Sequence, residues 1–160
     1  MLGLDPAIVE HHIETWLDAS PVRQKQHSLN LVKAPAIEVE IEKLRRIGFI
    51  YPIVYMSSVS NPIPINKKQD NINIFIDYHD LNFTCPKYNY PMPFIDQVID
   101  EWANHEILSF MYGFSVYIQI QIWQQDQYRM TFTTPWGTFT YCIMPFSLKN
   151  IGTTFQCTLS

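Results

Sequence analysis

The chain has 160 residues, of which 47% are hydrophobic and 16% are charged, and its formal net charge is −4. This length predicts a single domain or a part of a larger protein, and the composition excludes a chain that is disordered through high charge and low hydropathy. The acidic balance argues against a dedicated nucleic-acid-binding protein, because such proteins are usually basic.

The N-terminal part is predicted to be an extended lead followed by a helix. Prolines interrupt residues 1–33, and no helical period of apolar residues persists there. Over 36–47, by contrast, Ile37, Ile41 and Leu44 recur at helical spacing. A proline just before this stretch and a glycine just after it fit the two ends of a helix.

A hairpin of two strands is predicted next. A connector rich in serine and proline leads to a short apolar strand at 63–65, whose proline favours the edge of a sheet. Residues 67–71 are a polar turn. Three isoleucines within 72–76 then alternate with other residues, which is the period of a strand.

The central part is predicted to contain a loop, a helix and two strands. The three prolines within 82–93 indicate a loop, and a helix with an apolar stripe follows it to about Asn104. A buried strand is predicted at 107–111. A half-buried strand is predicted at 118–122, where isoleucines alternate with glutamines.

The C-terminal part is predicted to contain a second hairpin and a last helix. Strands at 130–133 and 138–143 flank Pro135-Trp136-Gly137, and a helix can begin near Lys149. Helices and hairpins that alternate irregularly predict an α+β fold with a mostly antiparallel sheet.

Cysteine usage and apolar runs bear on location. Cys85, Cys142 and Cys157 lack the spacing of a zinc site or a disulfide framework, so we expect them to be reduced and buried. No apolar run approaches the ~20 residues of a membrane-spanning helix. The first residues lack the features of a signal peptide. An intracellular location, either cytoplasmic or nuclear, and no contact with membranes are expected.

A series of short motifs occurs in a fixed order between residues 8 and 160. They are Ile41-Glu42-Lys43-Leu44, Gly48-Phe49-Ile50, Ser60-Asn61-Pro62-Ile63-Pro64-Ile65, Lys67-Lys68, Ile76-Asp77-Tyr78-His79-Asp80-Leu81-Asn82, Tyr90-Pro91-Met92-Pro93 with Ile95-Asp96, Leu108-Ser109-Phe110-Met111, Phe114-Ser115 with Tyr117, Thr134-Pro135-Trp136-Gly137-Thr138, and Met144-Pro145-Phe146-Ser147-Leu148-Lys149-Asn150. In order and spacing, the series resembles the reverse transcriptase of gypsy-type long-terminal-repeat retrotransposons.

The resemblance implies a domain organisation and an ancestral activity. Residues 34–160 would be the fingers and a truncated palm of a right-hand polymerase, preceded by the lead at 1–33. The family is an RNA-directed DNA polymerase, a nucleotidyltransferase within a Pol polyprotein. It takes an RNA or DNA template–primer and deoxynucleoside triphosphates. Two Mg²⁺ ions on palm carboxylates serve the transfer in the active family. Further palm, thumb and ribonuclease H segments would be missing here.

Departures from the family pattern predict that this chain is a degenerate, inactive fragment. The palm aspartate that binds metal is replaced by Tyr112, and a phenol is a poor ligand for Mg²⁺. The family's Tyr-x-Asp-Asp motif does not occur in the 160 residues. No intact catalytic residue, metal site or cofactor is therefore expected. Two family glycines are Val116 and Ser147, which predicts backbone strain if the family needs a positive φ there.

Six residues match nucleotide-binding positions of the family by resemblance: Lys67, Lys68, Asn73, Tyr117, Phe146 and Lys149. Asn73 stands where the family has an arginine, and an amide does not replace a permanent charge. Ordinary roles remain open for the others. The two lysines can form an exposed turn, Tyr117 can pack in the core, and Lys149 can be a solvated charge.

Two further functions remain open besides an inactive polymerase domain. The first is a non-catalytic module that binds nucleic acid or protein, in which aromatics such as Trp136 and Tyr141 would stack on bases. The second is a non-functional relic. Lysine and arginine become sparse after Lys87, so binding to nucleic acid is expected to be weak or absent.

Overall fold

A computed structural model describes residues 4–28, 32–66, 72–91, 94–103, 105–109 and 116–159. Its helices and strands are β1 (Glu10–His11), α1 (Ala34–Arg46), β2 (Ile50–Pro52), β3 (Pro62–Asn66), β4 (Ile72–Ile76), α2 (His79–Thr84), α3 (Ile95–Ala103), β5 (Gln121–Ile122), β6 (Thr131–Thr134), β7 (Gly137–Tyr141) and α4 (Ile151–Leu159). Two short 3₁₀ helices, η1 (Val116–Gln119) and η2 (Gln124–Arg129), flank β5.

The described strands form three small sheets. β2, β7 and β6 make an antiparallel sheet in that order, and β3 and β4 make an antiparallel hairpin. β1 pairs in parallel with β5, which places Glu10 beside Gln121. Helices combined with mainly antiparallel strands confirm the predicted α+β class, and both predicted hairpins are present.

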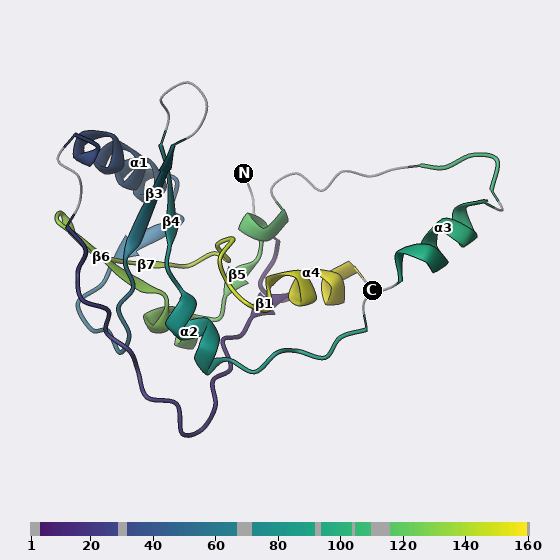
Figure 1. Ribbon diagram of the computed structural model, residues 1–160, viewed down its shortest axis with the longest axis horizontal. Coiled ribbons are helices and arrows are strands. Elements are labelled where there is room, and N and C mark those ends of the chain that lie inside the picture. The colour runs from purple at the N-terminus through teal and green to yellow at the C-terminus, as the bar shows by residue number, and fades with distance from the viewer. Residues whose placement is uncertain are drawn as a thin grey trace.

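Helix α1 forms where the sequence pattern predicts it. Ile37 and Ile41 are buried on one face, and Pro35 lies in the first turn. The helix is followed by Gly48 with a φ of +76°, a left-handed conformation that glycine adopts without the steric cost of a Cβ. In Figure 1, α1 lies beside the β3–β4 hairpin and above the β2–β7–β6 sheet.

The hydrophobic core lies between α1, the β2–β7–β6 sheet and the segment that follows β4. Ile37, Ile50 and Phe132 are almost completely buried. Tyr78 is 1% exposed, and its hydroxyl donates a hydrogen bond to the carbonyl oxygen of Met130 at 2.9 Å. Burial raises the pKa of Tyr78 well above its usual value, so this donor stays protonated.

Replacement of Phe132 by leucine is expected to lower the free energy of unfolding by about 1–2 kcal/mol. Phe132 is 0% exposed, and its ring centroid lies 6.0 Å from that of Phe139 and 5.6 Å from that of Tyr141. The smaller side chain leaves a void between these rings. Urea unfolding measures the change. Phe83→Leu is the control, because Phe83 is 80% exposed. Equal losses in both variants would contradict the prediction.

The described part of the lead, residues 4–28, is extended chain with turns near Asp5 and Asp18, and it includes the short strand β1. It is hydrogen-bonded to the rest of the chain. The Val59 N–H donates to the Val22 carbonyl oxygen at 3.0 Å, and the Asn61 Nδ2 donates to the Lys25 carbonyl oxygen at 2.9 Å. The domain boundary after residue 33 stays a prediction.

Two short elements occur where irregular chain was expected. β2 (Ile50–Pro52) opens the predicted connector, and α2 (His79–Thr84) overlaps the start of the predicted loop at 82–93. The expectations fail only at these residues, since 53–58 and 85–91 are irregular as predicted. β2 exists through its pairing with β7, far along the chain, and only Leu81 is buried within the short α2.

The two predicted strands before the second hairpin are also corrected. Residues 107–109 form no strand, and Ile107 is 88% exposed; residues 110 and 111 lie outside the described part. In the 118–122 stretch, η1 replaces the first half of the predicted strand, and only Gln121 and Ile122 are extended. Ile120 and Ile122 are nevertheless buried, because a 3₁₀ turn carries Ile120 into the core.

Helix α3 confirms the predicted second helix but lies away from the core (Figure 1). None of its residues is buried, and Phe94 just before it is 73% exposed. Trp102 is 44% exposed. The apolar stripe is therefore present on a helix that has no buried residue. No described helix has the length and apolarity needed to cross a bilayer.

The cysteines differ in burial. Cys85 is buried, Cys142 is partly buried, and Cys157 in α4 is exposed, which corrects the expectation that all three are buried. Cys157 lies on an outer side of a helix whose inner side carries Thr154. All three thiols are free.

Candidate functional site

A cleft of about 680 Å³ lies between α1, β4 and the segment 143–147. Its lining combines aliphatic and aromatic side chains with a few polar ones: Glu40, Lys43, Leu44, Ile47, Phe49, Asn73, Ile74, Phe75, Ile76, Ile118, Tyr141, Ile143, Met144, Pro145, Phe146 and Ser147. Pockets of this size and composition commonly hold small molecules. The cleft also contains two of the six residues that match nucleotide-binding positions of the family, Asn73 and Phe146.

Hydrogen bonds to neighbouring elements position the segment that closes the cleft. The Met144 N–H donates to the Ile120 carbonyl oxygen at 2.9 Å. The Asn82 side chain, on α2, donates to the Ser147 carbonyl oxygen at 2.7 Å and accepts from the Lys149 N–H at 2.9 Å. Asn82 thus fixes both sides of this turn. The sequence places Asn82 in a motif, but nothing local to it indicates this contact.

The structure brings together three of the six sequence-predicted site residues. Asn73 and Phe146 line the cleft, and Tyr117 packs edge-on against Phe146 with ring centroids 5.7 Å apart. Tyr117 also packs against Phe155 of α4 at 5.8 Å. Core packing is therefore an observed role of Tyr117. The nucleotide-binding roles of these residues stay predictions.

Lys149 does not line the cleft. Its Nζ donates to the carbonyl oxygens of Cys85 at 2.7 Å and Asn82 at 3.3 Å, at the end of α2. A cation is favourable there, because the carbonyl groups at the end of a helix carry partial negative charge. Lys67, Lys68 and Tyr112 lie outside the described residues.

The charges within the cleft compensate each other. Lys43 is the cleft's one lysine or arginine among the residues that the structure describes, and its Nζ lies 3.1 Å from a carboxylate oxygen of Glu40. A paired cation attracts an anionic ligand much less than a free one. The described lining of the cleft therefore offers no unpaired cation to a triphosphate.

Tyr141 is a buried polar residue of the cleft. It is 6% exposed, and its ring packs against Phe132. This burial does not fit the base-stacking role that the sequence left open for it. Burial raises the pKa of Tyr141 above the usual range, so the phenol remains a neutral hydrogen-bond donor.

Neither the cleft nor its surroundings supply a described metal site. Within the described ranges, no three His, Cys, Asp or Glu side chains are grouped so that they could hold a metal ion. The position expected for a metal-binding aspartate is Tyr112, which is not described. The expectation that this chain holds no metal stays a prediction.

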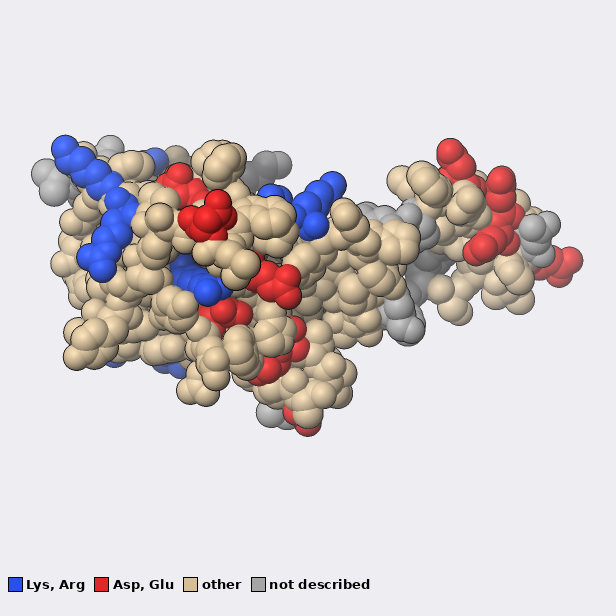
Figure 2. Space-filling model, turned by 90° about the horizontal axis from the view of Figure 1, so that it is seen from below, with Lys and Arg blue, Asp and Glu red and all other residues tan. Residues whose placement is uncertain are grey.

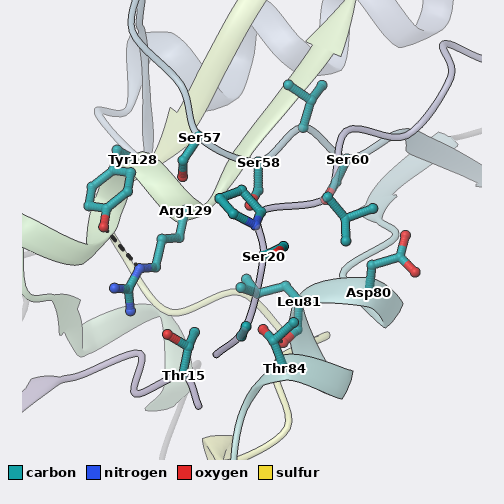
Figure 3. A pocket seen from close by; sticks show the side chains of 14 residues that line it. Thr15, Ser20, Ser57, Ser58, Ser60, Asp80, Leu81, Thr84, Tyr128 and Arg129 are labelled. Carbon is teal, nitrogen blue, oxygen red and sulfur yellow. Dashed lines mark hydrogen bonds between the residues drawn. The ribbon is translucent and has the colours of Figure 1, made fainter. Parts of the chain in front are cut away.

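A second, smaller pocket of about 110 Å³ lies where the lead crosses the body of the protein (Figure 3). Hydroxyl groups from the lead, from residues 57–60 and from α2 surround it, with Arg129 at one side and Asp80 at the other. Both charged groups have partners. Arg129 bonds Tyr128 and Asp126, and Asp80 accepts from Gln24 at 2.8 Å. The pocket is thus a crevice beneath the lead.

The surface charge is mixed. On the face shown in Figure 2, Lys and Arg side chains are scattered among Asp and Glu, and acidic side chains gather at the end formed by α3. Helix α3 itself carries Asp96, Asp100 and Glu101. This face has no continuous basic track among its described residues. Such a track is the usual footprint of nucleic-acid binding.

Comparison with known proteins gives relatives in sequence and in fold. No protein-family model matches the chain. It is 27% identical over 127 residues to the Transposon Tf2-3 polyprotein of Schizosaccharomyces pombe, and equally to the Transposon Tf2-7 polyprotein of that organism. The match covers 78% of this chain but only 9% of each polyprotein.

Solved structures with the same fold include the foamy viral protease-reverse transcriptase dRH in complex with double-stranded DNA. That match has a TM-score of 0.68 and 17% identity, and it covers 94% of this chain and 25% of the other. The same protein in complex with an RNA/DNA hybrid gives a TM-score of 0.68 and 16% identity, over 89% of this chain and 19% of the other. The chain is thus similar in sequence to a part of transposon polyproteins and has the fold of a part of a protease-reverse transcriptase.

Proposed function

We propose that this chain is a degenerate reverse transcriptase domain of a gypsy-type retrotransposon Pol polyprotein, made of fingers and part of a palm, and that it does not polymerise DNA. The agreement between the ordered motif series and the fold carries the proposal. The motifs extend over most of the chain, and the fold matches a protease-reverse transcriptase over 94% of it.

The loss of activity follows from Tyr112. Phosphoryl transfer to a growing strand needs metal ions that neutralise the developing charge. Tyr112 stands where the family has a metal-binding aspartate, and the described residues contain no other group of ligands. The residues present therefore do not fit the Mg²⁺ pair of the active family.

The proposal includes weak or absent binding to template–primer. The solved relatives were captured with double-stranded DNA and with an RNA/DNA hybrid. Here, the mixed charge on the face of Figure 2 and the loss of an arginine at Asn73 reduce the electrostatic contribution to such binding.

Primer extension on an RNA template tests the proposal. Incorporation of deoxynucleotides with Mg²⁺ or Mn²⁺ is expected to equal that of the heat-inactivated chain, while an active reverse transcriptase extends the primer in parallel. Tyr112→Asp is expected to stay at background too, because the 160 residues hold no Tyr-x-Asp-Asp motif. Template-dependent incorporation by the unmodified chain would refute inactivity.

A further inference from the structure

The cleft between α1, β4 and residues 143–147 is walled by apolar side chains. Leu44 and Ile47 line it from α1 and the residue just past it, Phe75 lines it from β4, and Phe146 lines it from the closing segment. Its volume of about 680 Å³ is ample for a molecule of two fused rings. Apolar walls on several sides favour a flat, apolar ligand.

The charges of the residues that line the cleft determine which ligands it can accept. Within the described lining, Glu40 and Lys43 neutralise each other at 3.1 Å, and Asn73 is uncharged. An anion that enters would lose its hydration without gaining a free cation in return. An uncharged ligand avoids this cost.

Two polar side chains offer hydrogen bonds to an occupant. Tyr141 and Asn73 both line the cleft, and no described residue forms a side-chain hydrogen bond with either of them. Only 6% of Tyr141 is exposed to solvent. A hydroxyl on the wall of an apolar cleft, with no side-chain partner among the described residues, favours a ligand that accepts its proton.

We propose that this cleft binds an uncharged, planar aromatic molecule that packs against Phe146 and accepts a hydrogen bond from Tyr141. The size, the apolar walls and the neutral charge of the cleft favour a flat, uncharged ligand. The Tyr141 phenol favours a ligand with a hydrogen-bond acceptor at its edge. The cleft would bind such a molecule whether or not the chain descends from a polymerase, so primer extension and ligand binding can fail independently.

Titration with prodan, an uncharged naphthalene ketone, tests the proposal. Saturable binding with blue-shifted emission is expected, and Ile47→Glu should weaken it at least about tenfold, because it places a charge in the cleft wall. Ile99→Glu is the matched control. Ile47 and Ile99 are 50% and 51% exposed, but Ile99 lies on α3, away from the cleft. Loss of binding in Ile99→Glu alone would overturn the proposal.

Two further measurements address the hydrogen bond and the charge. Tyr141→Phe keeps the ring and removes the hydroxyl, so it should weaken prodan binding about fivefold without loss of the folded signal. The anionic dye anilinonaphthalene sulfonate should bind the cleft more weakly than prodan. Unchanged affinity in Tyr141→Phe, or an anionic dye that binds more tightly in an Ile47-dependent manner, would overturn the proposal.

Discussion

Replacement of Asp126 by alanine is expected to lower the free energy of unfolding by about 3 kcal/mol. Asp126 is 6% exposed, and its carboxylate accepts the Ile13 N–H at 2.9 Å and pairs with Arg129 at 3.3 Å. Arg129 in turn donates to the Ile13 carbonyl oxygen. One ion pair therefore holds both backbone polar groups of a buried residue in the lead. Without the carboxylate, the Ile13 N–H loses its acceptor and the guanidinium loses its counter-charge.

Urea unfolding and limited trypsin digestion measure this effect. Asp126→Ala should shift the urea midpoint and speed cleavage at Arg23 and Lys25, because the lead loses a central attachment. The stability of Asp126→Asn should lie between that of Asp126→Ala and that of the unmodified protein, since its amide oxygen can still accept the Ile13 N–H. Asp18→Ala, which removes an exposed carboxylate of the same lead, is the control. A change below about 0.5 kcal/mol in Asp126→Ala would contradict the prediction.

Local patterns predicted the elements whose stability is local. The spacing of Ile37 and Ile41 gave helix α1, and the turn at Pro135-Trp136-Gly137 gave the β6–β7 hairpin. The parallel pairing of β1 with β5 could not be predicted in this way, because Glu10 and Gln121 are far apart in sequence. The exposed Ile107 shows the opposite failure. A short apolar run predicts a buried strand, but the structure leaves this run exposed.

The candidate site was predictable only in part, for a similar reason. Resemblance selected Asn73 and Phe146, which do meet in one cleft. Nothing in the sequence indicated that Lys149 would bond the end of α2, since that contact depends on how Asn82 fixes the turn. Nor did it indicate that Tyr141, at the end of β7, would be buried yet line the cleft. Contacts between distant segments decide both cases.

Acidification from pH 7 to pH 4 is expected to destabilise the protein through His11. This residue is 3% exposed, and its Nδ1 lies 2.7 Å from the Thr154 hydroxyl, so it joins β1 to α4. Burial, with a smaller contribution from the neighbouring His12, lowers the pKa of His11 from 6.5 to about 4. Between these two values the unfolded chain binds a proton that the folded chain does not. The free energy of unfolding therefore rises with pH across this window, by on the order of 3 kcal/mol. The rise is complete above pH 6.5.

Unfolding curves of His11→Gln isolate this contribution from that of the carboxyl groups. Glutamine does not titrate, so the variant should lose less stability than the unmodified protein between pH 6.5 and pH 4. The exposed His27 provides the control, and His27→Gln should retain the full pH dependence. Because His11 contacts α4 through Thr154, its protonation should also release this helix first, visible as earlier hydrogen exchange in residues 151–159. Equal pH slopes for His11→Gln and the unmodified protein would mean that the imidazole is hydrated in solution and that β1 and α4 are not joined there.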